Sequence, residues 1–136
     1  MTGLRKLRQD AAGSSAVEFA IAIPVLILFI YGFFTLGLLY QANAGLQHAL
    51  GEAARFATVY VEANDGPPTD SEIQTMIADS DFGLDGGTLQ APEIDNSQLA
   101  NGYKTITLTY SRPTEFLYFQ GPTVTLTRSK RVYIAT

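Results

Sequence analysis

The chain has 136 residues, with 9 basic and 13 acidic side chains, a net charge of −4 and no cysteine. This length gives room for one small domain, and the lack of cysteine excludes disulfides, thiolate metal sites and cysteine catalysis. Nine acids and no Lys or Arg lie between Val59 and Gly102, which excludes nucleic acid as a partner, because phosphate contacts need clustered basic side chains.

The N-terminal part predicts a membrane helix. Residues 1–13 carry three basic side chains against one acid, and the 22 residues of segment 19–40 carry no charge. As a helix this segment would be about 33 Å long at ~1.5 Å per residue, which is enough to cross a bilayer. The positive-inside rule then predicts a cytoplasmic N-terminus and an exported C-terminal part.

Two residues interrupt the apolar character of this region. Glu18 stands at the entrance of the membrane segment, where an unpaired carboxylate is unfavourable, so we expect it to be functional and to need a partner cation. Pro24 lies inside the segment, removes one helical hydrogen bond and predicts a kink.

A cleaved secretory signal is the alternative for this segment. Ala42-Asn43-Ala44, which precedes Gly45, has the small-x-small form that signal peptidase reads. However, apolar regions of signal peptides run about 7–15 residues, and this one is longer and continues into a helical pattern. We therefore favour an uncleaved anchor at this position.

The apolar pattern beyond the membrane segment predicts that the helix continues. One face carries small or apolar side chains at steps of three and four residues: Leu46, Leu50, Ala53, Ala57 and Tyr60. The run Asn64-Asp65-Gly66-Pro67-Pro68 should end the helix, because its prolines cannot donate hydrogen bonds. The sequence thus predicts a leader at 1–13 and a helix over 14–62 with its membrane-spanning part at 19–40.

Residues 63–136 predict a small exported α+β domain. Ser71–Asp79 has the spacing of a short helix, with Thr69 or Asp70 as its N-cap. Three β-rich stretches follow at Thr88–Ile94, Tyr103–Ser111 and Thr123–Ala135, and the last two alternate between apolar and polar residues. We expect a small antiparallel sheet packed on the amphipathic second half of the long helix.

The N-terminus has the form of a class III signal: a basic leader, Gly13, a glutamate five residues on, then an apolar helix. This form resembles the type IV pilins and pseudopilins. Two further segments narrow the match, Ala16-Val17-Glu18-Phe19-Ala20-Ile21-Ala22-Ile23-Pro24 and Glu52-Ala53-Ala54-Arg55-Phe56-Ala57. They are similar to the TadE-like family of the tight-adherence (Tad) type IV pilus system.

This resemblance implies a pseudopilin or minor pilin of the bacterial inner membrane. Prepilin peptidase would cut between Gly13 and Ser14, and Glu18 would then pair with the N-terminal amine of a neighbouring subunit, so that Glu18 and Phe19 set the helix register. The implied partners are prepilin peptidase, other pilins and minor pilins, the assembly platform of the inner membrane and the lipid bilayer. The extra C-terminal domain implies a minor rather than a major pilin.

Neither catalysis nor a cofactor is expected. His48 is the only histidine and has no partner residue for catalysis that the sequence reveals. Asp79, Asp81 and Asp85 alternate in a glycine-rich loop as in a calcium-binding turn, but the loop fails the EF-hand pattern, so a solvated loop is the stronger interpretation. The competing function is a membrane-anchored periplasmic binding module that does not enter a pilus.

Overall fold

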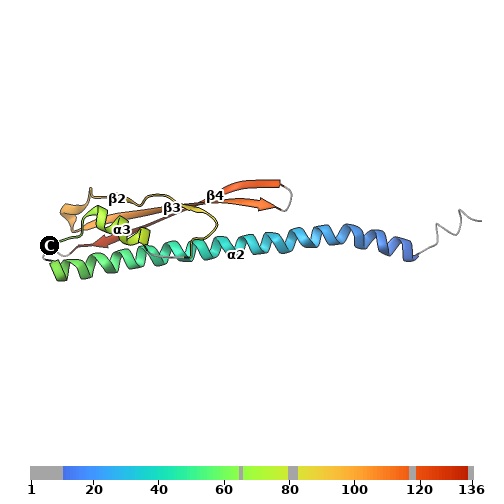
Figure 1. The fold of residues 1–136 in the computed structure, drawn as a ribbon, viewed down its shortest axis with the longest axis horizontal. Helices are drawn as coiled ribbons and strands as arrows, with labels where there is room; N and C mark the ends of the chain where they lie inside the picture. Colours follow the sequence, from blue (N-terminus) through green and yellow to red (C-terminus); the bar gives the residue numbers. More distant parts are fainter. Residues whose placement is uncertain (1–10, 65, 80–82, 117–118, 135–136) are drawn as a thin grey trace, which may run out of the picture. The chain divides into compact units, whose positions relative to one another are not determined.

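The computed structural model describes residues 11–64, 66–79, 83–116 and 119–134. The helix α2 (Ala11–Asn64) is followed by the short helix α3 (Asp70–Asp79) and then by a β-rich region (Figure 1). This region holds the strands β1 (Thr88–Leu89), β2 (Glu93–Asp95), β3 (Tyr103–Phe116) and β4 (Phe119–Tyr133), with a 3-10 turn at Leu99–Asn101 before β3. The α+β class predicted from the sequence is confirmed.

The chain divides after Gly37 into two compact units, Met1–Gly37 and Leu38–Thr136. The helix α2 contributes to both units: it has 54 residues, continues on both sides of Pro24 and ends at Asn64. The helix thus begins three residues before and ends two residues after the predicted range 14–62. Its end lies two residues before Gly66-Pro67-Pro68, as expected for a segment that cannot extend a helix.

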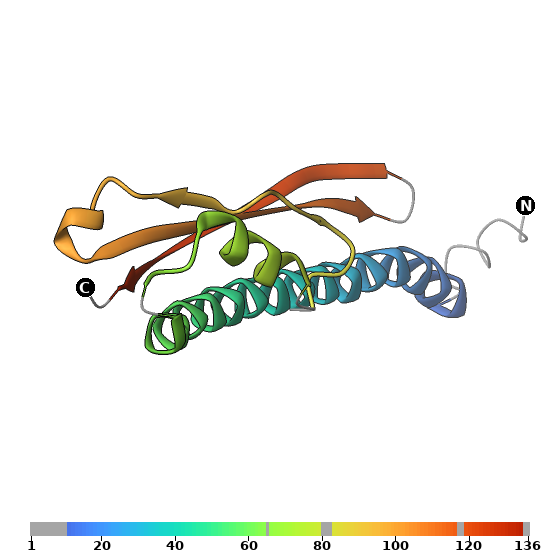
Figure 2. The ribbon, with the colours of Figure 1, turned by 60° about the vertical axis from the view of Figure 1, so that its left-hand side comes forward.

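The sheet of the second unit is antiparallel and centred on β3. The strand β4 pairs along one side of β3 from Tyr103↔Tyr133 to Phe116↔Phe119, with a register shift between Pro113 and Glu115. Because β4 occupies that side, β1 and β2 share the other side of β3 (Figure 2). The sheet therefore has β4 at one edge and the β1–β2 segment at the opposite edge.

The predicted strand Thr88–Ile94 is interrupted in the structure. Leu89 pairs with Tyr110 and Glu93 pairs with Thr107. The first residues of these two pairs are four positions apart, whereas their partners on β3 are three positions apart. Such an extra residue is a bulge, and Pro92 within it has no N–H to contribute to a ladder. By contrast, β3 extends beyond the predicted end at Ser111 to Phe116, and β4 starts at Phe119 rather than at Thr123.

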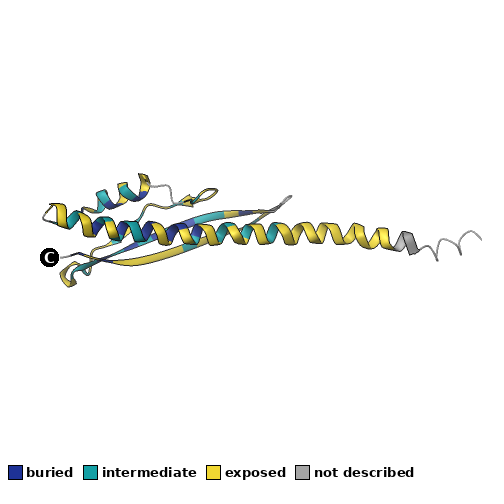
Figure 3. Cartoon of the chain, turned by 90° about the horizontal axis from the view of Figure 1, so that it is seen from below, coloured by how far each residue is buried: buried dark blue, intermediate teal, exposed yellow. Residues whose placement is uncertain are grey.

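One hydrophobic core joins the second half of α2, α3 and the inner face of the sheet. The predicted helix face is confirmed, because Leu46, Leu50, Ala53 and Ala57 are buried while Tyr60 is half-buried. Figure 3 shows the buried residues concentrated in this half of α2, in α3 and in the sheet. The remaining members of the core are Ala42, Ala49, Ile73, Ile77, Ile106, Leu108, Tyr110 and Val132. Alanines on the buried face of α2 allow close packing without large side chains between the elements.

Reciprocal hydrogen bonds fix the start of α3. The Thr69 backbone N–H donates to Glu72 Oε2 at 2.7 Å, and the Glu72 N–H donates to Thr69 Oγ1 at 3.3 Å. This is a capping box, which satisfies two backbone donors that a helix start otherwise leaves unpaired. Thr69 is thus the N-cap.

Candidate functional site in the N-terminal helix

The first turns of α2 hold the residues that the sequence singles out. Gly13 and Ser14 lie in its first turn, where backbone N–H groups have no acceptor within the helix. Glu18 follows Ser14 by four residues, so the two share one helix face about 6 Å apart along the axis.

The first unit exposes a continuous apolar surface. The side chains of Glu18 and Phe19 are both exposed, Phe19 by 67%. Beyond them, large apolar side chains are exposed on every side of the helix: Ile21, Ile23, Val25, Leu26, Ile27, Leu28, Phe29, Ile30, Phe33, Phe34 and Leu36. A helix that is apolar all round needs an apolar environment, and within the described residues α2 is the one helix long and apolar enough to cross a membrane.

The cation that we expect to pair with Glu18 is not nearby in the sequence. No Lys or Arg lies between Gln9 and Ala54. The helix positions three and four residues from Glu18 are Ser14, Ser15, Ile21 and Ala22, none of which carries a positive side chain. A cation at the level of Glu18 would therefore come from residues 1–8, from a new N-terminus or from another molecule.

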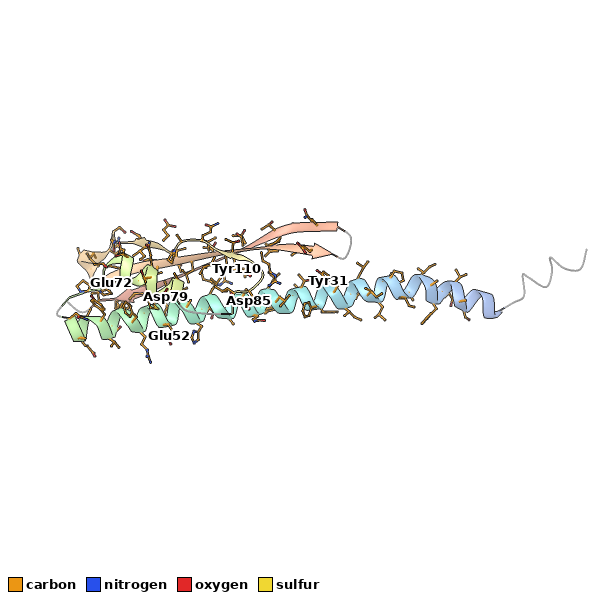
Figure 4. The ribbon with its side chains drawn as sticks, in the orientation of Figure 1. Tyr31, Glu52, Glu72, Asp79, Asp85 and Tyr110 are labelled. Atoms are coloured by element: carbon orange, nitrogen blue, oxygen red, sulfur yellow. The ribbon has the colours of Figure 1, made fainter. Side chains whose placement is uncertain are left out.

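The glycine loop that suggested a calcium turn contacts β3. The Asp85 backbone carbonyl accepts hydrogen bonds from Tyr110 Oη at 3.1 Å and from Arg112 Nη1 at 2.8 Å. Figure 4 labels Asp85 and Tyr110. Asp79 is the last residue of α3, and Asp81 lies outside the described residues. Within the described part of the chain no three His, Asp, Glu or Cys side chains are grouped as metal ligands. Whether the loop is only solvated, as the sequence favours, or binds calcium stays untested.

Two polar clusters in the second unit hold α3 in place, and the sequence did not reveal them. In the first, Lys104 on β3 is buried and donates from Nζ to Asp70 Oδ1 at 2.8 Å and to the Pro68 carbonyl at 3.3 Å. Asn96 Nδ2 also donates to Asp70, at 2.6 Å. The bond from Lys104 is the largest influence that lowers the pKa of Asp70, and the bond from Asn96 adds to it. The sequence could have indicated that Lys104 is buried, because it lies on the same face of the strand as Ile106 and Leu108.

The second cluster joins α2 to α3. Tyr60 Oη donates to Glu72 Oε1 at 2.6 Å, and Thr69 donates to the other carboxylate oxygen. The bond from Tyr60, followed by those from Thr69, lowers the pKa of Glu72, and the same bond raises the pKa of Tyr60. Next to this cluster, Phe56, Val59 and Met76 line a shallow groove between the two helices. Glu52 and Arg55 also line this groove, and Arg55 Nε lies 3.6 Å from Glu52 Oε2.

The fold and the N-terminal site together define a protein with one candidate membrane-spanning helix, which continues into a small α+β unit. Residues 13–55 match the family model described as TadE-like protein, so the predicted resemblance is confirmed over this part of the chain. No curated protein and no solved structure gives a significant match. The family match indicates involvement with the Tad pilus system, whose TadE-like members are not known as enzymes, and the exposed apolar helix fits membrane anchoring.

Proposed function

We propose that this protein is a pseudopilin or minor pilin that takes part in assembly of a Tad (Flp-type) pilus for adherence. In this proposal, prepilin peptidase cuts between Gly13 and Ser14, segment 19–40 spans the inner membrane with the N-terminus in the cytoplasm, and residues 63–136 form the exported domain. The observation that carries the proposal is the TadE-like match over residues 13–55, which includes Gly13 and Glu18. Its partners are the peptidase, other pilins and the assembly platform of the inner membrane.

Cleavage after Gly13 would supply the cation that Glu18 lacks. The new amine at Ser14 has an ordinary pKa of about 7.7–8.0 and is largely protonated at neutral pH. When helices of neighbouring subunits bundle, Glu18 of one can pair with this amine of the next, so that both charges are neutralised in apolar surroundings. Removal of one member of a buried ion pair typically loses about 3–5 kcal/mol, which makes Glu18 a register device for assembly.

The buried face of α2 supports the continuous helix over a signal cut before Gly45. Ala42 and Gly45 are both buried, and Ala42 belongs to the core of the second unit with Leu46 and Ala49. A cut between Ala44 and Gly45 would remove Ala42 from that core. Cleavage at Gly13 would leave the core intact.

A membrane-anchored binding module is the second candidate, and the groove beside Phe56, Val59 and Met76 is the observation that favours it. Val59 is 54% exposed, so part of this apolar surface is open to a partner. In that case the exported unit would act without entry into a fibre, and Glu18 would be dispensable.

Incorporation of a Glu18 variant separates the two functions. The producing bacterium would express the full chain as wild type, Glu18→Gln or the matched control Glu52→Gln, an acid outside the membrane segment. We expect equal amounts in the membrane and a loss of at least tenfold of Glu18→Gln from sheared pili and from complexes with sister pilins. Wild-type incorporation of Glu18→Gln would contradict the register role of Glu18. Absence of the wild-type chain itself from pili and from complexes with sister pilins would contradict the proposal and favour the binding module.

A further inference from the structure

The outer edge of β4 is a long strand edge without a partner in the described structure. All 15 residues of β4 belong to a strand that pairs with β3 on one side, and no described strand pairs with its other side. Free backbone N–H and C=O groups along such an edge can pair with a strand of another molecule. The side chains of the edge then decide which partner is accepted.

The side chains near the end of β4 make this edge basic. Arg128, Lys130 and Arg131 are exposed, and none forms an ion pair with a described carboxylate. Arg128 Nη1 donates to the Thr127 carbonyl at 2.9 Å, and Arg131 lies 5.4 Å from the centre of the Tyr103 ring. Arg128 pairs with Leu108 and Lys130 with Ile106, so these two cations share the face of the sheet that carries Leu108 and Ile106. Arg131 pairs with Thr105 and lies on the other face.

The opposite edge of the sheet is acidic. Glu93 and Asp95 of β2 are exposed and pair with Thr107 and Thr105, so both carboxylates lie on the outer face of the sheet. Asp95 accepts hydrogen bonds from the Ser97 backbone N–H and hydroxyl, which lower its pKa and keep it ionised at neutral pH. Neither carboxylate forms an ion pair within the described residues. One sheet therefore carries unneutralised charges of opposite sign at its two edges.

This arrangement discriminates between two ways of joining copies of the chain. A symmetric contact of β4 with β4 that is centred on residues 128–131 would bring three cations against three cations, which is unfavourable. A contact of β4 with the β2 edge of the next copy brings opposite charges together. Such a head-to-tail contact uses two different surfaces, so its repetition gives an open filament or a ring.

We propose that the basic β4 edge of one copy docks on the acidic β2 edge of a second copy, with Arg131 on the same face of the sheet as Glu93 and Asp95 and with Arg128 and Lys130 on the opposite face. This contact goes beyond the proposed function and does not depend on cleavage after Gly13, because every residue that forms it lies in the second unit.

A charge-swap experiment on the full chain in detergent micelles tests this contact. The acidic variant carries Arg128→Glu, Lys130→Glu and Arg131→Glu, the basic variant carries Glu93→Lys and Asp95→Lys, and each is made with two different tags. Copurification of the two tagged forms measures self-association. A control with Glu62→Lys and Asp79→Lys changes two exposed acids on the helices, and circular dichroism checks that each variant is folded.

We expect the wild type and the control to self-associate, and a rise from 50 to 500 mM salt to weaken this association. The acidic and the basic variant alone should each lose self-association at least tenfold, and mixing them should restore it. Three results would overturn the proposal: a monomeric wild type, a basic variant that self-associates like the wild type as in symmetric β4 pairing, or a mixture that fails to restore association. Loss of processing at Gly13 would contradict the proposed function and leave this result unchanged.

Discussion

Lys104 Nζ lies 2.8 Å from Asp70 Oδ1, and this ion pair joins β3 to the first residue of α3. The Lys104 side chain is only 8% exposed, so its charge depends on Asp70 and on the Pro68 carbonyl. We expect Asp70→Asn to lower the free energy of unfolding by about 1–2 kcal/mol, because it removes a charged hydrogen bond. The loss is not larger because Asp70 is 41% exposed, and solvent weakens the interaction. Urea denaturation in micelles measures this, with Asp79→Asn as a control that loses nothing.

The same pair predicts a pH dependence. Lys104 lowers the pKa of Asp70 in the folded protein, so the contribution is fully present above the ordinary pKa of 3.8 and is lost as the pH falls through the lowered value. The stability difference between wild type and Asp70→Asn should therefore be constant near neutral pH and shrink below about pH 3.8. A difference that is unchanged at pH 2 would show that the charge of Asp70 is unimportant.

The capping box of α3 predicts an effect of Thr69→Ala. This change removes the side-chain acceptor for the Glu72 N–H and one donor to its carboxylate, and loss of such a cap typically lowers stability by about 1 kcal/mol. Thermal unfolding followed by circular dichroism would measure the change. Thr75→Ala is the control, because Thr75 donates only to the Ser71 carbonyl within the helix, and equal effects of both changes would contradict the role of the cap.

Periodic segments of the chain were the most predictable. The spacing of Leu46, Leu50, Ala53 and Ala57 predicted the buried face of α2, and the alternation around Ile106 and Leu108 predicted the inner face of β3. These patterns follow from burial on one side of a regular element. The bulge between β1 and β2 was not predictable, because strand pairing tolerates an extra residue wherever tertiary packing requires one.

The close packing of Gly87 on Tyr110 predicts an effect of Gly87→Ala. A Cβ at Gly87 would meet the Tyr110 hydroxyl and ring and would lie 2.7 Å from the Ser111 carbonyl oxygen. Overpacking of this kind lowers stability by about 1–3 kcal/mol. Gly66→Ala is the matched control, because no heavy atom lies within 4 Å of a Cβ there. If Gly87→Ala unfolds at the same urea concentration as the control, the loop does not pack on Tyr110 as described.

Some parts of the candidate site could be predicted from the sequence, and others could not. The uncharged segment after Glu18 and the residues around Gly13 were recognisable locally, because length, charge and motif lie in consecutive residues. The Lys104–Asp70 pair spans 34 positions and forms only when α3 packs near β3. The bond from Tyr60 to Glu72 likewise needs α2 and α3 to be side by side, which residue order alone does not determine.

Processing after Gly13 is the central claim, and the intact mass of the protein in membranes tests it most directly. The chain would be purified through a C-terminal tag from cells with and without prepilin peptidase, together with a Gly13→Val variant. We predict a chain that begins at Ser14 in peptidase-positive cells and an unprocessed chain in both other samples. A chain that retains residues 1–13 in the presence of the peptidase, or one that begins at Gly45, would contradict the claim.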